Sequence, residues 1–221
     1  MTKHSHNLAL VVSSILLISC GADNTASRIT LGTSGTGIFD YTDQQYQMPF
    51  ALIVTNTQGN AAANQKVTLK VVPIQYYKGD YVLGAESWGT VVTATCTKED
   101  TNQNGILDAG EDINGNGHLD PTNPAVIAPH PEEEPTLINS SELITDEWGN
   151  GYFSLIYPKA EANWVQVQIT ASTQVTGTEA AETLLFNLPA SVPDMESIGT
   201  LPPSGDLPSK YGQLAPCSDP N

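Results

Sequence analysis

The sequence predicts an all-β protein, and three observations lead to that expectation. Gly and Pro, which interrupt helices, number 18 and 15 among the 221 residues. Long stretches rich in Ala, Glu, Lys and Leu, which are typical of helical bundles, are missing. Apolar and polar residues instead alternate in about seven short segments separated by Gly, Asn and Pro, a pattern typical of a β-sandwich.

The amino terminus has the pattern of a bacterial export signal. A basic residue precedes an apolar run over residues 8–18, which is too short to cross a hydrocarbon layer of about 30 Å. The run ends in Leu17-Ile18-Ser19-Cys20, which resembles the lipobox of bacterial lipoproteins. The resemblance implies a signal peptide over residues 1–19, a lipid anchor on Cys20 and, with glycine as the next residue, an outer-membrane location. The alternative is an ordinary signal peptide that leaves Cys20 as a free thiol.

Two polar segments flank the predicted folded part, which spans residues 47–190. Residues 20–46 contain many Gly, Thr and Ser residues and are expected to form a flexible spacer between the lipid and the fold. Residues 191–221 are rich in proline, which cannot donate a backbone hydrogen bond. We therefore expect an extended tail here and not an inner strand of a sheet.

Alternation of apolar and polar residues defines the predicted strands. It is clear at Phe50, Leu52 and Val54. The turn-forming residues 56–60 connect this strand to the next one, so the two strands are expected to lie in one sheet. The β-branched run that ends at Cys96 is expected to bury at least one face. The predicted strands cover residues 48–54, 67–71, 76–82, 88–96, 143–144, 152–157, 164–171 and 183–188.

Two blocks of these strands resemble a known family. Ala51-Leu-Ile-Val-Thr-Asn-Thr-Gln-Gly-Asn-Ala61, followed by Asn64-Gln-Lys-Val-Thr-Leu-Lys-Val71, is similar to the opening hairpin of bacterial Ig-like domains of the invasin and intimin type. Thr145-Asp-Glu-Trp-Gly-Asn-Gly-Tyr-Phe-Ser-Leu155 resembles a turn and strand of that family, and Trp164-Val-Gln-Val-Gln-Ile-Thr-Ala171 resembles its penultimate strand. The resemblance implies an Ig-like β-sandwich of about seven strands over residues 47–190. A long acidic insertion over residues 99–136 departs from the family.

Cys96 and Cys217 are the two cysteines that remain when Cys20 carries the lipid. Compartments beyond the inner membrane are oxidising, so these two cysteines are expected to form a disulfide. The bridge would tie the tail to the end of a predicted strand. The alternative is a pair of free thiols.

The acidic insertion contains two consecutive calcium-loop patterns. Residues 99–147 hold 12 of the 24 acidic residues and no Lys or Arg, so a positively charged partner is expected. Residues 100–111, the first loop, match D-x-[DN]-x-[DN]-G-x₅-E at every position. Residues 112–123, the second loop, repeat the pattern with Asn at the twelfth position. The expected ligands are Asp100, Asn102, Asn104, Ile106, Asp108 and Glu111 in the first loop, and Asp112, Asn114, Asn116, His118 and Asp120 in the second.

The spacing of these residues explains why calcium is the expected ion. Side-chain oxygens at positions one, three and five surround one cation, and glycine at position six lets the chain reverse. Position seven offers a backbone carbonyl, here from Ile106 and His118. Hard oxygen ligands favour calcium over zinc or copper. The first loop carries three carboxylates and the second two, so we expect tighter binding in the first and one or two ions in all. The alternative is a solvated acidic loop without an ion.

Charge and composition narrow the possible functions. A formal charge of −16 disfavours binding to nucleic acids and to anionic lipid surfaces. The mature chain has no histidine placed for a catalytic triad and no phosphate-binding loop, so an enzyme is not expected. We expect a calcium-stabilised, lipid-anchored Ig-like module at the cell envelope, structural or adhesive, acting as an accessory subunit with a surface protein partner. The alternative is a glycan-binding module in which Trp148, Tyr76 and Tyr77 stack on sugar rings.

Overall fold

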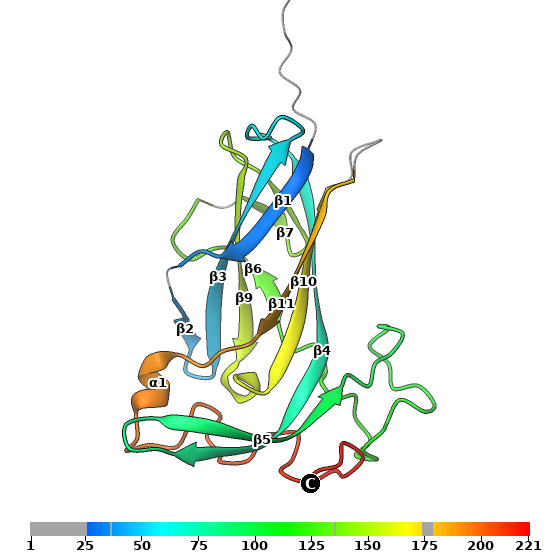
Figure 1. Cartoon of the computed structure of the whole chain (residues 1–221), viewed down its shortest axis with the longest axis vertical. Coiled ribbons are helices and arrows are strands. Elements are labelled where there is room, and N and C mark those ends of the chain that lie inside the picture. The colour runs from blue at the N-terminus through cyan, green and yellow to red at the C-terminus, as the bar shows by residue number, and fades with distance from the viewer. Residues whose placement is uncertain (1–25, 36, 135, 174–178) are drawn as a thin grey trace, which may run out of the picture.

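The computed structural model describes residues 26–35, 37–134, 136–173 and 179–221. In these residues two antiparallel sheets pack against each other, which confirms the predicted all-β sandwich (Figure 1). The first sheet has the order β1-β3-β9-β6, with β2 paired to β3; its strands are β1 (Ala26–Thr33), β2 (Phe39–Thr42), β3 (Gln45–Asn56), β6 (Val126–Ala128) and β9 (Asn150–Pro158). The second has the order β11-β10-β4-β8-β7, with β5 paired to β4; its strands are β4 (Lys66–Leu83), β5 (Trp88–Thr97), β7 (Leu137–Asn139), β8 (Glu142–Ile144), β10 (Val165–Thr173) and β11 (Ala181–Asn187). The described helices are the 3₁₀ helix η1 (Lys159–Glu161) and α1 (Val192–Glu196).

The core lies between the two sheets and is built from the inward-facing residues of alternating strands. Phe50 of β3 stacks on Phe153 of β9, with ring centroids 5.4 Å apart. Phe186 of β11 packs edge-on against Phe50 at 5.0 Å and so joins the two sheets. Each buried apolar side chain stabilises the fold by roughly 25 cal/mol per Å² removed from water. Further buried core residues are Leu52, Val54, Val67, Leu69, Leu155, Val165, Val167 and Ile169.

The predicted strands correspond to strands of the structure, but the connection between one pair and the sheet assignment of another pair differ from the expectation. Residues 67–71 and 76–82 belong to one continuous strand, β4. The first two predicted strands were expected in one sheet, and this prediction is wrong, because β3 and β4 lie in opposite sheets. Residues 57–65 carry the chain from one layer to the other. Alternation reveals that a strand has one buried face, but both layers of a sandwich share this pattern, so it does not assign the sheet.

Part of the segment predicted as a flexible spacer is structured. Within residues 20–46, β1 pairs along β3 from Ala26 to Thr33 and buries Ile29 and Leu31 in the core, and β2 pairs with the start of β3. The prediction was wrong for these residues because most residues of β1 are small or polar. Its two buried apolar side chains gave an alternation too weak to predict a strand. Residues 20–25, Cys20 among them, and the predicted signal peptide lie outside the described residues. No described helix is long and apolar enough to cross a membrane.

The second half of β4 leaves the sandwich and forms a hairpin with β5, seen at the base of Figure 1. β4 is 18 residues long, and its pairing passes from β10 to β5 around Gln75 and Tyr76. A shift in register between Lys78 and Gly79 interrupts the pairing with β5. The carboxy-terminal tail packs against this hairpin, and the acidic loops lie beside it.

The carboxy-terminal tail, residues 191–221, packs against the hairpin. The Tyr81 N–H donates to the Leu207 carbonyl at 2.8 Å, and the Ser209 N–H donates to the Gly79 carbonyl at 2.8 Å. The Tyr211 ring is buried and lies 4.8 Å from the Tyr76 ring. As predicted, the described tail adds no strand to either sheet. The expectation of an extended tail fits poorly, because α1 and these contacts fix it to the domain.

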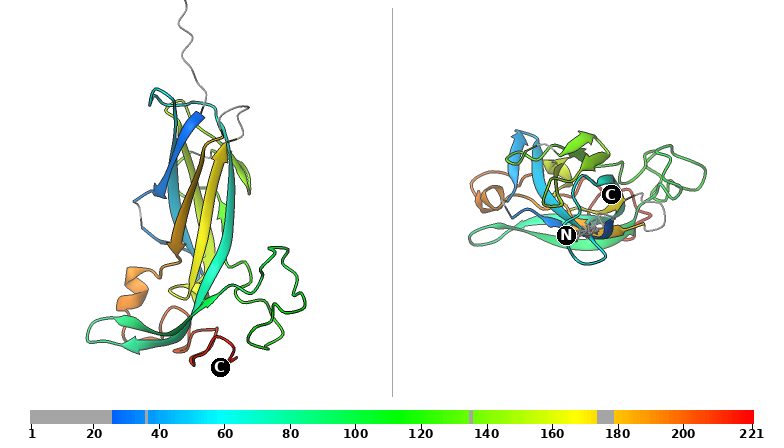
Figure 2. Two further views of the ribbon diagram at one scale, coloured as in Figure 1. Left: turned by 45° about the vertical axis from the view of Figure 1, so that its right-hand side comes forward. Right: turned by 90° about the horizontal axis from the view of Figure 1, so that it is seen from above.

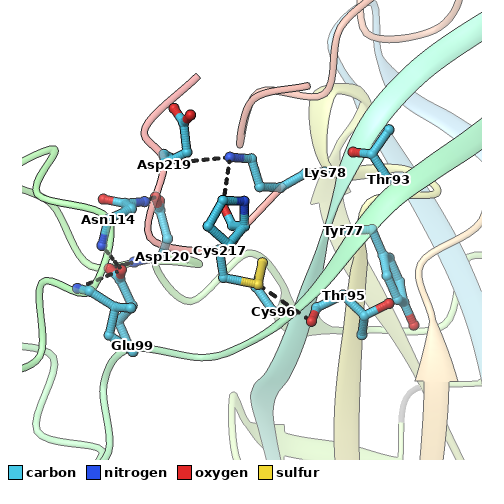
Figure 3. Close-up of a disulfide and its surroundings, with 12 residues drawn as sticks. Tyr77, Lys78, Thr93, Thr95, Cys96, Glu99, Asn114, Asp120, Cys217 and Asp219 are labelled. Atoms are coloured by element: carbon cyan, nitrogen blue, oxygen red, sulfur yellow. Dashed lines mark hydrogen bonds between the residues drawn. A yellow bond between two sulfur atoms is a disulfide. The ribbon is translucent and has the colours of Figure 1, made fainter. Parts of the chain in front are cut away.

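The predicted disulfide is present between Cys96, the buried penultimate residue of β5, and Cys217 in the tail. The sulfur atoms are 2.05 Å apart and the Cα atoms 5.5 Å apart. Lys78 lies nearby and is buried, and its Nζ donates to the Asp219 carbonyl at 2.5 Å (Figure 3). The bridge therefore holds the end of the chain close to the start of the acidic insertion.

Candidate metal centre

The two predicted calcium loops directly follow β5 and form a lobe beside the β4–β5 hairpin (Figure 2). The chain returns to the sandwich at Ala125, which is buried, and continues into β6. The second loop lies against the domain, with Asn114 and Leu119 buried, whereas most of the first loop is exposed. The insertion is therefore anchored at both ends and through its second half.

The first loop folds around side-chain oxygens at the positions that the calcium pattern specifies. The Asp100 carboxylate accepts hydrogen bonds from the N–H groups of Asn104, at 3.2 Å, and Gly105, at 2.9 Å. The Asn102 Oδ1 accepts from the Asn104 N–H at 3.0 Å, and the Asn104 Oδ1 accepts from the Ile106 N–H at 2.7 Å. Gly105 at position six has a φ of 73°, the left-handed conformation that the pattern requires.

The second loop repeats this arrangement. The Gly117 N–H donates to Asp112 Oδ2 at 3.1 Å, and Gly117 has a φ of 80°. The N–H groups at positions five and seven donate to the side-chain oxygens of Asn114, at 3.0 Å, and Asn116, at 2.8 Å. The two loops therefore share these contacts at positions one, three, five, six and seven.

The carboxylates at position nine contact the amides of positions three and five. In the first loop, the Nδ2 atoms of Asn102 and Asn104 each donate to Asp108 Oδ2 at 2.8 Å, and these donors lower the pKa of Asp108. In the second, Asp120 Oδ2 accepts at 2.8 and 2.7 Å from the corresponding amides. Throughout the described part of the chain, no three His, Cys, Asp or Glu side chains are grouped to hold a metal ion.

Glu111, at position twelve, closes the first loop. Its Oε1 accepts hydrogen bonds from the Thr101 N–H, at 2.9 Å, and the Thr101 hydroxyl, at 2.8 Å. Its Oε2 accepts from the Asp108 N–H at 3.1 Å. The carboxylate thus joins positions two and nine of its own loop, and these donors, the Asp108 N–H first, lower the pKa of Glu111.

The second loop contains a buried oxygen that lacks a hydrogen-bond partner, Asp112 Oδ1. A carboxylate oxygen in such a position costs free energy unless a donor or a cation compensates its charge. Position one is where the calcium pattern places the first ligand. The oxygen donor set of the loops and this unpartnered atom therefore fit a hard divalent cation such as calcium.

Glu99, an acidic residue next to the first loop, is not among the predicted ligands. Its side chain is fully buried at the end of β5, where Figure 3 shows it beside Asn114 and Asp120. Burial raises the pKa of Glu99, against the effect of backbone N–H donors. The twelve-residue pattern begins at Asp100 and so excludes Glu99. The first residue of each loop is preceded by a glutamate, Glu99 or Glu111, and this repetition is the signal that could have identified it.

Of the three aromatic residues considered for glycan binding, Tyr76 is buried, Tyr77 is half-buried and Trp148 is exposed. Trp148 is exposed, with 65% of its surface accessible, but Tyr76 is buried at 1%. Trp148 follows β8, whose Ile144 pairs with Lys66, and Tyr76 lies ten residues further along β4. This spacing corresponds to about 30 Å at 3.3 Å per strand residue. Tyr76 is not accessible to a sugar ring because Tyr211 of the carboxy-terminal tail covers it.

Comparison of the chain with protein-family models, curated proteins and solved structures finds no match. The residues of the chain itself therefore carry what can be inferred about its role.

Proposed function

We propose that this protein is a calcium-stabilised β-sandwich module of the bacterial envelope, with a structural or adhesive role and a lipid anchor at Cys20. The observation that carries the calcium part is the repeated loop arrangement, in which position-one and position-six residues contact each other in the same way twice, together with the unpartnered Asp112 Oδ1. The anchor and the envelope location rest on the resemblance of residues 17–20 to a lipobox. The antiparallel two-layer architecture supports an Ig-like fold.

The role of the ion would be to order the acidic lobe. Residues 99–123 carry six acidic residues and no Lys or Arg, so the charges of the lobe repel one another at neutral pH. Bound calcium would neutralise this repulsion, and the side chains at positions one, three, five and nine would contribute oxygens to it. The ordered lobe would then present a fixed surface beside the hairpin to a protein of the envelope.

Limited proteolysis tests the proposed function. In millimolar calcium, cleavage within residues 99–123 is expected to be at least tenfold slower than in chelator, because the ion closes both loops and cleavage requires local opening. Cleavage sites are mapped by mass spectrometry, and magnesium at the same concentration controls for ionic strength. The double variant Asp100→Asn, Asp112→Asn is expected to lose the protection, and Asp43→Asn, at an exposed position outside the lobe, to keep it. Digestion patterns that are identical in calcium and in chelator would contradict the proposal.

A further inference from the structure

The Glu99 carboxylate binds the second loop, although Glu99 immediately precedes the first. Its Oε1 accepts hydrogen bonds from the N–H groups of Ile113, at 3.0 Å, and Asn114, at 3.2 Å. Its Oε2 accepts from the Asp120 N–H at 2.9 Å. The backbone adds a further link, because the Glu99 N–H donates to the Asp120 carbonyl at 2.8 Å.

These contacts reproduce those of Glu111 in the first loop. Glu111 joins position two, Thr101, to position nine, Asp108. Glu99 joins the same positions of the second loop, Ile113 and Asp120. The residue at position twelve of the second loop is Asn123, which is exposed. Glu99 therefore occupies the structural place of the twelfth-position glutamate in the loop that lacks one.

The two glutamates that close the loops, Glu99 and Glu111, hold equivalent places in the sequence. Each loop begins at the aspartate of a Glu-Asp pair, Glu99-Asp100 for the first loop and Glu111-Asp112 for the second. In each pair the aspartate is the first residue of the loop that follows, whereas the glutamate closes the other loop. Each loop is thus completed by the residue that precedes the first position of its neighbour.

The surroundings of Glu99 indicate a role beyond packing. Glu99 is fully buried and takes part in none of the ion pairs formed by the described residues. The same loop holds the unpartnered oxygen Asp112 Oδ1. A buried carboxylate, Glu99, and a buried carboxylate oxygen, Asp112 Oδ1, at the same loop and without a basic partner cost free energy, which a divalent cation would offset.

We propose that Glu99 belongs to the calcium site of the second loop and supplies the carboxylate that this loop lacks at its twelfth position, so that two ions bind to a reciprocally closed pair of loops. This inference rests on the proposed calcium-binding function. It also changes the expectation that calcium binds more tightly to the first loop. With Glu99, the second loop has three carboxylates, as the first loop does, so the number of carboxylates no longer predicts weaker binding there.

A calcium titration followed by NMR distinguishes the two loops. The N–H groups of Gly105 and Gly117 donate to the position-one aspartates of the first and second loop, so their resonances report each loop separately. In the unaltered full chain, both resonances are expected to shift with added calcium. In Glu99→Gln the calcium affinity reported by Gly117 is expected to fall at least about tenfold, with Gly105 much less affected. Glu111→Gln is expected to give the reverse, and Glu182→Gln, at an exposed position on β11, no change.

The outcomes separate this inference from the function on which it rests. If neither glycine resonance responds in the unaltered chain, calcium binding itself is wrong. If both respond there, but Gly117 in Glu99→Gln titrates as in the unaltered chain, calcium binding stands and the role of Glu99 is wrong. Glu99→Asp, which keeps the charge but shortens the side chain, provides a second test if Glu99→Gln does not fold. It is expected to weaken calcium binding at Gly117 in the same way, and unchanged binding there would overturn the inference.

Discussion

Calcium at one hundred times its dissociation constant is expected to raise the free energy of unfolding by about 5 kcal/mol, because each of two sites contributes about 2.7 kcal/mol when the ion binds only the folded chain. For a domain of this size, that change corresponds to a rise in melting temperature of roughly 10 to 20 °C. Thermal denaturation followed by circular dichroism, in calcium and in chelator, measures the difference.

Magnesium and a loop variant provide the controls for this prediction. Magnesium prefers octahedral sites with several retained waters, so the same concentration of magnesium is expected to raise the melting temperature by much less. Asp100→Asn combined with Asp112→Asn is expected to abolish most of the calcium effect, whereas Asp43→Asn keeps it. Equal melting temperatures in calcium and chelator for the unaltered chain would speak against an ion in either loop.

Replacement of Cys96 and Cys217 by serine is expected to lower the free energy of unfolding by about 4 kcal/mol. The bridge closes a loop with a sequence separation of 121 residues, and loop closure of this length restricts the unfolded chain strongly. Urea denaturation of the variant and of the unaltered protein, with the midpoint and the dependence on urea concentration fitted separately for each, gives the difference in stability.

Reduction of the unaltered protein is the matched control, since it removes the same bond without changing the sequence. It is expected to shift the urea midpoint to that of the serine variant. Amide exchange should be accelerated first where the tail meets the hairpin, at Tyr81 and Ser209, whose N–H groups join the two segments. A variant with the midpoint of the oxidised protein would show that contacts such as that between Tyr76 and Tyr211 hold the tail without the bond.

Local patterns in the sequence predicted those features of the structure that depend on the type and spacing of nearby residues. Alternation located β3 and β10 because each has one face in the core. The glycines at position six of the loops were predicted from the pattern, and both adopt a positive φ. The disulfide followed from the redox compartment and from the two cysteines that remained after assignment of Cys20.

Relations between distant segments could not be predicted in the same way. Nothing in the alternation of β3 and β4 distinguishes two strands of one sheet from strands in opposite sheets. β1 buries Ile29 and Leu31 but is otherwise polar, so its pairing with β3 decides its structure. Tyr76 became a core residue because Tyr211, far along the chain, covers it.

The candidate site shows the same division. The eleven predicted ligands all lie within the two loops that the calcium pattern defines. The structure places the side chains at positions one, three and five of the two loops in equivalent contacts. Glu99 lies outside the pattern and meets Asp120 at a sequence separation of 21. The folding of one loop against the other brings it there, which a single-loop pattern cannot specify.

Isothermal titration calorimetry of the folded protein with calcium tests the central claim most directly. Two ions per chain are expected, with heat released or absorbed at ion concentrations no higher than millimolar, the range of extracellular calcium modules. The absence of any heat of titration at millimolar calcium, with circular dichroism showing an intact β-sandwich, would contradict the claim that these loops bind the ion.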